Sequence, residues 1–407
     1  MLSRRELLAA ALGVVPAAGG GWPKVRRERW AESGAFPAPV LQALSRIVAS
    51  APRAKYWTSP AIAGSDCLAC HEPGTFRERD HAHNPKTVKC LLCAQGCVIP
   101  DGARGSCRAR MNVAGELRSL VYGRPMATAV DPIEKKPFFH FLPGSTAYSL
   151  STSGCPLRCR FCQNWQISQA SPEDYDSPHT SPADVTATAS GRGAPVIAFT
   201  YNEPTVFAEY LLDIAAEARK RKMRPVAVSC GFMNEAPLSD MCRVLDAIKV
   251  DLKGFSEEFY RDVCGASLKP VLRSIQQAAK SGVHLEIVNL VVPTLNDSDA
   301  SLEALTGWVA RELGRDVPLH FSRFFPNYQL QNLPPTPIST LTRARQIALA
   351  RGLRYVYVGN ADHEGNHTYC PACRQLVVQR TGFFVTRMNL ENGRCRFCRT
   401  PIAGVWE

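Results

Sequence analysis

Three cysteines lie close together in the segment GCPLRCRFCQNW, which covers residues 154–165. Cys155, Cys159 and Cys162 follow a C-x3-C-x2-C spacing. Cysteines grouped at such short gaps are typical of metal or iron–sulfur ligands rather than of a disulfide framework. A [4Fe–4S] cluster normally takes four thiolates, so three thiolates leave one iron open to another ligand. The segment therefore predicts an iron–sulfur site at which a small molecule supplies the fourth ligand.

S-adenosylmethionine (SAM) is a suitable fourth ligand because its amino and carboxylate groups can chelate an iron ion. One electron passed from the reduced cluster into its sulfonium would break a C–S bond and release a 5′-deoxyadenosyl radical, which can abstract hydrogen from an unactivated carbon. The protein would hold the cluster, orient the cofactor and exclude water. The alternative is a structural zinc or iron–sulfur loop that borrows a distant cysteine.

Two further groups of cysteines form complete four-thiolate sets. The first set has the spacing C-x2-C-x3-C-x9-C and predicts zinc or a second [4Fe–4S] cluster that relays electrons; it consists of Cys90, Cys93, Cys97 and Cys107. The second set has the spacing C-x2-C-x21-C-x2-C and predicts a structural zinc ribbon or, alternatively, a single rubredoxin-type iron; it consists of Cys370, Cys373, Cys395 and Cys398. Residues 382–388 between its two halves predict a hairpin strand. The isolated Cys230, Cys242 and Cys264 are expected to be buried apolar residues.

The N-terminal region carries two signals that concern location and haem. Residues 1–21 place Ser3-Arg4-Arg5 before a short apolar run, which predicts a twin-arginine signal and a periplasmic protein, with a cytoplasmic protein as the alternative. Cys67, Cys70 and His71 have the C-x2-C-H form of a c-type haem attachment, with His81 or His83 as a second axial ligand. No segment is long and apolar enough to predict a membrane span.

The chain has 407 residues and a formal net charge of +12 at neutral pH. The excess of cations is spread along the chain, and no basic run is interleaved with aromatic residues. We therefore predict no nucleic-acid partner and assign the cations to a solvated surface.

The pattern from residue 147 onward alternates short apolar runs with amphipathic segments. Six strands and a possible seventh are expected, and strands alternating with helices predict a parallel sheet covered by helices, most economically an α/β fold with a complete or partial (β/α) barrel. The expected strands cover residues 148–152, 196–201, 225–230, 247–251, 284–292, 319–324 and, as the seventh, 354–358. Helices are expected over 205–222, 270–281, 299–313 and 339–351.

Unusual polar motifs follow these strands at their carboxyl ends, where barrel active sites are assembled. The three-cysteine loop follows the first strand, NEP (202–204) the second, GFMN (231–234) the third and DLK (251–253) ends the fourth; PTLND (293–297) and RFFPNY (323–328) belong to the fifth and sixth.

With these motifs the sequence resembles the radical SAM superfamily, whose signature is the C-x3-C-x2-C loop with an aromatic residue, here Phe161, before the last cysteine. The segments KCLLCAQGCVIPDGARGSCRARMN, DPIEKKPFFHFLPG, FTYNEPTVF, IKVDLKGF and YCPAC resemble the radical SAM enzymes of the AmmeMemoRadiSam system, which are related to the activating enzymes of glycyl-radical enzymes. The resemblance covers roughly residues 88–407.

The resemblance implies roles for individual residues. Cys155, Cys159 and Cys162 would ligate the [4Fe–4S] cluster, and the cofactor-binding residues would be Phe161, Gln163, Glu203, Asp251 and Lys253. Glu203 stands where the family has the glutamate of Gly-Gly-Glu-Pro, whose backbone or carboxylate would accept hydrogen bonds from the methionine ammonium. This sequence has Tyr201-Asn202 in place of the two glycines, which puts a close backbone approach in doubt. Asp251 and Lys253 share one face of a strand and would bind ribose hydroxyls and the methionine carboxylate; a surface ion pair is the alternative. His320 and Arg323 are weaker candidates for the barrel mouth.

These interpretations divide the chain into a signal (1–21), a loosely structured lead-in with the C-x2-C-H motif (22–89), a four-cysteine module (90–130), the barrel (131–360) and a zinc-ribbon-like module (361–407). The expected partners are SAM, an electron donor, and a protein substrate or another member of the AmmeMemoRadiSam system; direct modification of a small molecule or peptide is a further reading. The alternative function is a non-catalytic metal or electron-transfer protein whose clusters are all coordinatively full.

Overall fold

The computed structural model describes residues 38–63 and 86–407. The predicted export signal and the residues predicted to carry haem, which are Cys67, Cys70, His71, His81 and His83, lie outside the described residues. Within the described part, no helix is both long and apolar enough to span a bilayer.

An eight-stranded sheet forms the centre of the molecule. Seven neighbouring strands run parallel in chain order, and the first strand of the sheet is antiparallel to its neighbour. The strands are β6 (Ala127–Pro132), β7 (Thr146–Ser151), β8 (Val196–Phe199), β9 (Arg224–Ser229), β10 (Ala247–Asp251), β11 (His284–Val291), β12 (Leu319–Arg323) and β13 (Val356–Gly359). β7–β13 correspond to the seven strands expected from the sequence, and β6 was not expected. Because β6 and β13 are the two edges, the barrel is open, and the α/β core with its mostly parallel sheet is confirmed.

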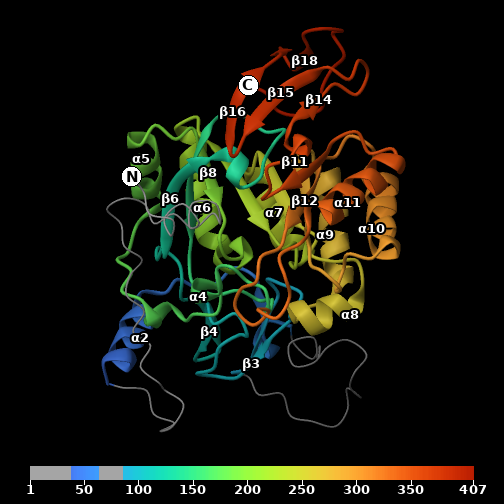
Figure 1. Cartoon of the computed structure of the whole chain (residues 1–407). Coiled ribbons are helices and arrows are strands. Elements are labelled where there is room, and N and C mark those ends of the chain that lie inside the picture. Colours follow the sequence, from blue (N-terminus) through green and yellow to red (C-terminus); the bar gives the residue numbers. More distant parts are fainter. Residues whose placement is uncertain (1–37, 64–85) are drawn as a thin grey trace, which may run out of the picture.

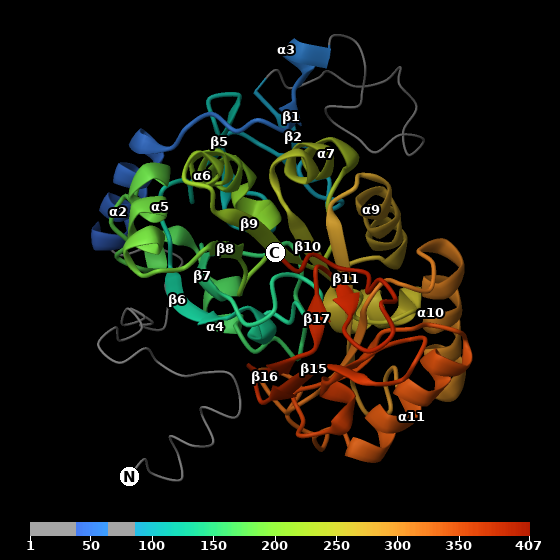
Figure 2. The same cartoon turned by 90° about the horizontal axis from the view of Figure 1, so that it is seen from above.

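Helices cover the outer surface of this sheet, as Figure 2 shows when the molecule is viewed from above. They are α5 (Pro182–Gly191), α6 (Ala208–Lys220), α7 (Glu235–Val244), α9 (Leu268–Lys280), α10 (Asp299–Glu312) and α11 (Ile338–Ala350). α6 shows why they pack there, since Leu211, Ile214 and Ala218 recur at helical spacing and are all fully buried.

A small N-terminal unit precedes the sheet. It contains α2 (Ala38–Ser50), β1 (Trp57–Thr58), α3 (Pro60–Ala63), β2 (Val88–Cys90), β3 (Val98–Ile99), β4 (Arg110–Val113) and β5 (Glu116–Ser119). β1 pairs with β2, and Trp57 lies opposite Cys90. The described part of the predicted lead-in therefore contains ordered elements, and residues 57–58 belong to the same small sheet as Cys90.

A C-terminal unit of short antiparallel strands completes the chain. It contains β14 (Thr368–Tyr369), β15 (Leu376–Thr381), β16 (Phe384–Met388), β17 (Leu390–Glu391) and β18 (Arg394–Cys395), and β16 confirms the hairpin strand expected over 382–388. The unit binds to the segment that precedes β7, because the buried Arg380 donates through Nη2 to the carbonyl of Phe139 at 2.7 Å. Figure 1 shows the two units at opposite ends of the barrel, with β3 and β4 at the end that carries α4 (Trp165–Ser168) and β14–β18 at the other.

Candidate active site at the three-cysteine loop

The three-cysteine loop leaves β7 at the carboxyl end of the sheet. Gly154 begins it in the left-handed region at φ 92°, and a side chain there would meet the carbonyl oxygen of Cys107 at 2.3 Å. Only glycine fits this position without moving the backbone. The carbonyl of Gly154 accepts a hydrogen bond from Nδ2 of Asn202 at 2.8 Å, which ties the loop to the segment after β8.

Backbone hydrogen bonds fix the middle of the loop against other strand ends. The amides of Arg158 and Arg160 donate to the carbonyls of Cys264 (2.8 Å) and Val263 (2.9 Å), which belong to the single π-helical turn η5 (Tyr260–Cys264) after β10. The carbonyl of Arg160 accepts from the amide of Gln329 at 2.9 Å, in the segment after β12. The loop, which itself follows β7, is therefore held by the segments that follow β8, β10 and β12.

The three thiols occupy environments of different polarity. Cys159 is buried, and Cys155 and Cys162 are half-buried. Burial raises the thiol pKa of Cys155 and of Cys162, whereas a hydrogen bond with Cys264 and the cation of Lys253 lower the pKa of Cys159. Thiolates are the metal-binding form, so occupation of the loop by a metal centre would be coupled to proton release. Cys264, expected to be an inert buried residue, is thus a neighbour of a predicted ligand.

The structure brings Phe161, Asp251 and Lys253 together. The ammonium of Lys253 lies 5.9 Å from the centre of the Phe161 ring and 3.4 Å from the Asp251 carboxylate. Lys249 lies two residues before Asp251 on β10, and its ammonium approaches the other carboxylate oxygen of Asp251 at 2.9 Å. All three residues of the Asp251 cluster are largely sheltered: their side chains are 5% (Lys249), 31% (Asp251) and 16% (Lys253) exposed. A surface ion pair, the alternative reading of Asp251 and Lys253, does not fit this burial.

Lys249 was missed by the sequence reasoning, although the alternation in IKVDLK carried the signal. Residues two apart on a strand point to the same face, so Lys249 belongs with Asp251 and Lys253. Burial disfavours the charge of Asp251, but the two ammonium groups outweigh this effect and hold its carboxyl pKa below the ordinary value. The carboxylate is therefore ionised at neutral pH.

Comparison with known proteins agrees with this geometry. Residues 149–305 match the Radical SAM superfamily. The chain is 43% identical over 318 residues to "Uncharacterized protein MJ0808" of Methanocaldococcus jannaschii, an alignment that covers 77% of this chain and 95% of that protein.

The chain belongs to the radical SAM superfamily.

More distant relatives include the pyruvate formate-lyase 1-activating enzyme of Escherichia coli, which is 23% identical over 223 residues and is matched over 50% of this chain and 89% of its own length. Among solved structures, a radical SAM methyltransferase from Sphaerobacter thermophilus aligns with a TM-score of 0.43 at 14% identity, over 73% of this chain and 79% of that one. The superfamily match and the similarity to the Escherichia coli protein identify the chain as a radical SAM enzyme with similarity to an activating enzyme of a glycyl-radical enzyme. Membership of this superfamily implies a [4Fe–4S] cluster and SAM.

The residues of this radical SAM enzyme fit those groups. The three thiols come from one loop, and several buried polar atoms beside it have no hydrogen-bond partner within the described chain. They lie at or just after the carboxyl ends of β7, β8 and β10 and are Ser151 Oγ, Ser153 Oγ, Asn202 Oδ1 and Asp251 Oδ1. Buried polar atoms normally have partners, so these atoms indicate a polar ligand next to the cysteines.

 Asp251 Oδ1 lies at ion-pair distance from the ammonium of Lys249, 2.9 Å, but accepts no hydrogen bond of good geometry from it.

Glu203 is buried and joins the ends of β8 and β9. Its Oε1 accepts hydrogen bonds from the amide and the hydroxyl of Thr205 (3.1 and 2.6 Å) and from Ser229 Oγ (2.8 Å), and its Oε2 accepts from the amide of Cys230 (2.7 Å). A carboxylate has about four acceptor sites, so these bonds engage the side chain almost completely. The carbonyl of Glu203 accepts from the amide of Val206 at 3.1 Å but has a second acceptor site, so the backbone is the one of the two possibilities implied by the resemblance that keeps capacity for a ligand.

Tyr201 stands in place of a glycine of the related motif and adopts a backbone conformation typical of glycine. It adopts φ 71°, the left-handed conformation that glycine reaches without strain and that other residues adopt at a cost of roughly 1 kcal/mol. Its hydroxyl donates to Asp131 Oδ2 at 2.9 Å, and the ammonium of Lys136 lies 5.1 Å from its ring centre. The glycine-like backbone conformation is therefore held by side-chain contacts.

Three residues predicted to lie at the site remain to be placed: Gln163, His320 and Arg323. Gln163 is half-buried directly after Cys162. His320 is fully buried and hydrogen-bonds Glu286 at 2.6 Å, and Arg323 donates to the carbonyl of Thr336 at 2.8 Å. The side chains of both weaker candidates are thus engaged in contacts within the protein.

The C-terminal cysteines form a compact site far from the loop. The sulfurs of Cys370, Cys373, Cys395 and Cys398 lie within 4.8 Å of one another, with 3.5 Å between Cys370 and Cys398 and 3.7 Å between Cys373 and Cys395. Zn–S bonds of about 2.3 Å in a tetrahedron separate the sulfurs by just under 4 Å, so the set fits a single metal ion. The geometry fits the C-terminal metal-binding module that the sequence predicts.

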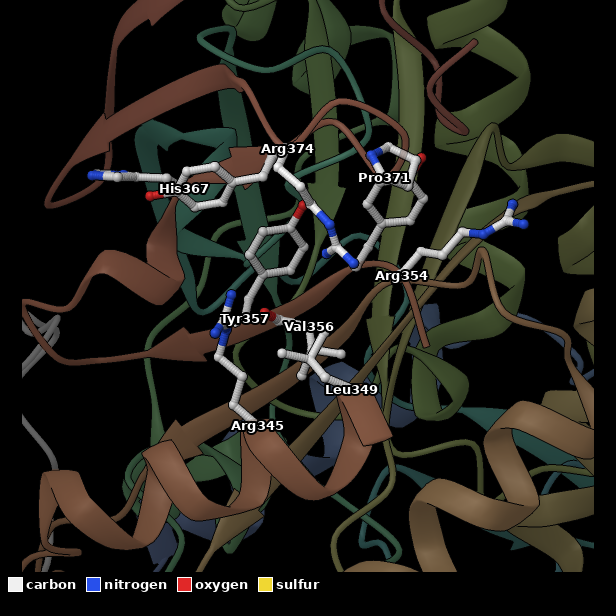
Figure 3. Close-up of a pocket in the computed structure, with 10 residues that line it drawn as sticks. Arg345, Leu349, Arg354, Val356, Tyr357, His367, Pro371 and Arg374 are labelled. Atoms are coloured by element: carbon white, nitrogen blue, oxygen red, sulfur yellow. Dashed lines mark hydrogen bonds between the residues drawn. The ribbon is translucent and has the colours of Figure 1, made fainter. Parts of the chain in front are cut away.

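A cavity of about 190 Å³ lies beside this module, between α11, β13, β14 and the turn that follows β14 (Figure 3). Arg345, Tyr357, His367 and Arg374 are among the residues that line it. It is at the end of the barrel opposite the three-cysteine loop and takes no part in that site.

Proposed function

We propose that this radical SAM enzyme cleaves SAM reductively at a [4Fe–4S] cluster held by Cys155, Cys159 and Cys162 and uses the resulting radical on a partner protein. When bound, the cluster and SAM supply the one-electron chemistry that makes a 5′-deoxyadenosyl radical. The observation that carries the proposal is the convergence of three thiols with the Asp251–Lys253 pair at the carboxyl end of the sheet.

The chain's own groups bind and orient the cofactor in this account. Lys253 supplies a cation for the methionine carboxylate, and Asp251 supplies acceptors for ribose hydroxyls. Lys249 keeps Asp251 ionised and fixes the direction of its carboxylate. The ring of Phe161 lies beneath the ammonium of Lys253, and Glu203 ties the segment after β8 to the carboxyl end of β9.

The buried setting also serves the chemistry. A radical able to attack an unactivated carbon must be kept from solvent and from side reactions. Cys159, Phe161 and Glu203 are all less than a tenth exposed, so the cysteine loop is covered by protein on its barrel side.

The similarity to an activating enzyme favours a protein substrate over a small molecule. The motifs shared with radical SAM enzymes of the AmmeMemoRadiSam system favour a partner from that system. We further propose zinc at the C-terminal four-cysteine site, where it would have a structural role.

Isotope transfer distinguishes the substrate classes. A candidate partner protein is produced in deuterated medium and incubated with the enzyme, unlabelled SAM and reductant, and 5′-deoxyadenosine is analysed by mass spectrometry. Deuterium in 5′-deoxyadenosine, with none when the enzyme carries Cys155→Ala, Cys159→Ala and Cys162→Ala, supports a protein substrate. Deuterium that appears only when a labelled small-molecule extract replaces the protein contradicts it.

A further inference from the structure

The N-terminal four-cysteine set lies directly against the three-cysteine loop. The carbonyl of Cys107 occupies the space where a side chain at Gly154 would be, at 2.3 Å from that position. Nε2 of Gln95 donates to the carbonyl of Pro156 at 3.0 Å, and Nη2 of Arg158 donates to the carbonyl of Ser106 at 3.3 Å. Cys107 and Cys155 are thus joined through contacts that place their Cα atoms about 10 Å apart or closer.

The set is built as a sulfur-ligand site. A backbone amide reaches each sulfur: Leu92 for Cys90, Gln95 for Cys93, Ser106 for Cys97 at 3.5 Å, and Ala109 together with Arg110 for Cys107. Three of the four cysteines are buried, and Cys97 is partly exposed. Amide hydrogen bonds to sulfur stabilise thiolates and tune the potential of iron–sulfur clusters.

Arg110 provides an independent sign of an anionic ligand at the same place. Its side chain is fully buried, and Nη2 pairs with Glu209 Oε2 at 2.6 Å, whereas Nε and Nη1 have no hydrogen-bond partner within the described chain. The guanidinium interacts electrostatically with the sulfurs of both Cys90 and Cys107, which places it beside this set. Two donor nitrogens without a partner in a buried guanidinium would be costly unless an acceptor is bound there.

The arrangement of the sulfurs favours a cluster over a single ion. The C-terminal set uses two C-x2-C pairs and draws its sulfurs to within 4.8 Å of one another; in residues 38–63 and 86–407 no such compact group forms among Cys90, Cys93, Cys97 and Cys107. A cube of four irons needs its thiolates farther apart than a single tetrahedral zinc does. The run C-x2-C-x3-C also reverses the spacing of the three-cysteine loop, with Cys107 as a fourth thiolate that completes the coordination.

We propose that Cys90, Cys93, Cys97 and Cys107 hold a second iron–sulfur cluster, that Arg110 donates hydrogen bonds to it, and that it passes single electrons to the cluster of the three-cysteine loop. The relay part rests on the proposed function. A one-electron protein donor of the ferredoxin or flavodoxin class would reduce the second cluster. That cluster is reoxidised when it reduces the first, so one electron leaves the donor for each SAM cleaved and the second cluster is unchanged over a cycle.

The first experiment counts and identifies the clusters. The full chain and the variant with Cys155, Cys159 and Cys162 replaced by alanine are reconstituted without oxygen. The variant should retain iron and sulfide for one cube, and its reduced state should give an electron paramagnetic resonance signal that SAM does not alter. Zinc without iron in this variant would overturn the proposal. The readout does not depend on SAM cleavage, so it holds even if the proposed function fails.

The second experiment tests Arg110 through the midpoint potential of that signal, measured in the same three-cysteine variant background. Glu209→Gln leaves the guanidinium uncompensated and should raise the potential. Arg110→Gln combined with Glu209→Gln removes both charges without stranding a buried carboxylate and should lower the potential relative to Glu209→Gln alone. The matched control is Arg118→Gln combined with Glu116→Gln, a partly exposed ion pair on the β4–β5 hairpin, which should cause no shift. Equal potentials for all variants would overturn the role of Arg110.

The third experiment tests the relay with a chemical bypass. Replacing Cys90 and Cys107 by alanine should slow SAM cleavage driven by a protein donor at least tenfold and leave cleavage driven by dithionite within about twofold. Cys242→Ser, a cysteine outside all the sets, is the control for loss of a thiol. An unchanged rate with the protein donor would overturn the relay. Loss of both activities while the signal of the first cluster persists would assign the set a structural role and would also overturn it.

Discussion

The hydroxyl of Tyr201, in the segment after β8, donates to Asp131 on the edge strand β6 at 2.9 Å and thereby helps to hold Tyr201 at φ 71°. The motif resemblance places Tyr201 where related enzymes have glycine, the residue that reaches positive φ without strain. Glycine reaches it by lacking a side chain, and tyrosine reaches it because its side chain is anchored.

This relationship predicts a difference between two truncations of Tyr201. Tyr201→Gly and Tyr201→Ala both remove the ring and the hydroxyl, but only glycine adopts positive φ freely. We expect the alanine variant to bind SAM more weakly than the glycine variant by up to about fivefold, which corresponds to roughly 1 kcal/mol of backbone strain. Equilibrium binding to the reconstituted protein measures this. Equal affinities would show that the backbone conformation at Tyr201 does not matter for the cofactor.

Lys253 and Lys249 should differ in their effect on SAM. Lys253→Met removes the cation proposed to bind the methionine carboxylate, and we expect the dissociation constant for SAM to rise at least tenfold with iron content unchanged. Lys249→Met removes a cation that acts only through Asp251 and should cause a smaller rise. If Lys249→Met weakens SAM binding more than Lys253→Met does, the assignment of the two lysines is reversed.

His140 gives the fold a dependence on pH. It is fully buried, and its ring contacts the carbonyl of Ala403 and the hydroxyl of Tyr357. Burial lowers its pKa from 6.5 to about 3. Between these values the unfolded chain binds a proton that the folded chain does not, so His140 makes the protein less stable as pH falls through this range.

The corresponding variant is His140→Asn, which does not titrate. We expect it to be less stable than the wild type at pH 7, with the difference in the free energy of unfolding shrinking by up to about 1.4 kcal/mol for each pH unit below 6.5. Denaturant unfolding at pH 7, 6 and 5 measures the difference. The exposed His179, replaced by asparagine, is the control, and a difference that stays constant with pH for His140→Asn would contradict the prediction.

Loss of the C-terminal metal should lower the stability of the fold without removing the cluster of the three-cysteine loop. Replacing Cys370 and Cys373 by serine should release one metal ion, zinc on our proposal, and lower the free energy of unfolding by several kcal/mol, because the binding energy of a structural metal contributes to folding. Iron at the three-cysteine loop should be retained, because the two sites lie at opposite ends of the barrel. Metal analysis of both elements in one preparation, with Cys242→Ser as the control, measures this; an unchanged zinc content would remove the module's assignment.

The N-terminal signals lead to a prediction about location. We expect the native chain to reach the periplasm, and Arg4→Lys combined with Arg5→Lys to keep it in the cytoplasm, because the twin-arginine pair is the proposed export signal. Haem absorbance that depends on Cys67 and Cys70 should accompany the exported form. Cell fractionation that finds the wild-type chain only in the cytoplasm, without haem, would contradict both readings.

Much of the barrel could be predicted because its signal is local. Strands β7–β13 are apolar runs of ordinary length, and α6 has a clear apolar face. α5 and α7 were missed for local reasons as well: the sequence PADVTATASG of α5 has few large apolar residues, and α7 carries a proline, Pro237, in its first turn. β6 was missed because the segment around it is rich in proline and alternates weakly.

The site was predictable where residues share one strand or one loop, and not where distant segments meet. Cys155, Cys159 and Cys162 lie within eight residues of one another, and Asp251 and Lys253 are two residues apart, so both patterns can be read from a short segment. The contact of Gly154 with Cys107 and the burial of Arg110 beside Cys90 depend on how the N-terminal unit packs against the barrel, which no short pattern encodes. The same holds for Glu203, whose four hydrogen bonds come from two strand ends.

The central claim is that the three-cysteine loop makes this protein a SAM-cleaving enzyme, and its most direct test is the reductive formation of 5′-deoxyadenosine. The reconstituted wild-type chain with dithionite and SAM should form 5′-deoxyadenosine, and replacement of Cys155, Cys159 and Cys162 by alanine should abolish this while metal remains at the two four-cysteine sites. Formation of 5′-deoxyadenosine by the triple variant at the wild-type rate, or its absence from a wild-type chain whose loop carries a full cluster, would contradict the account.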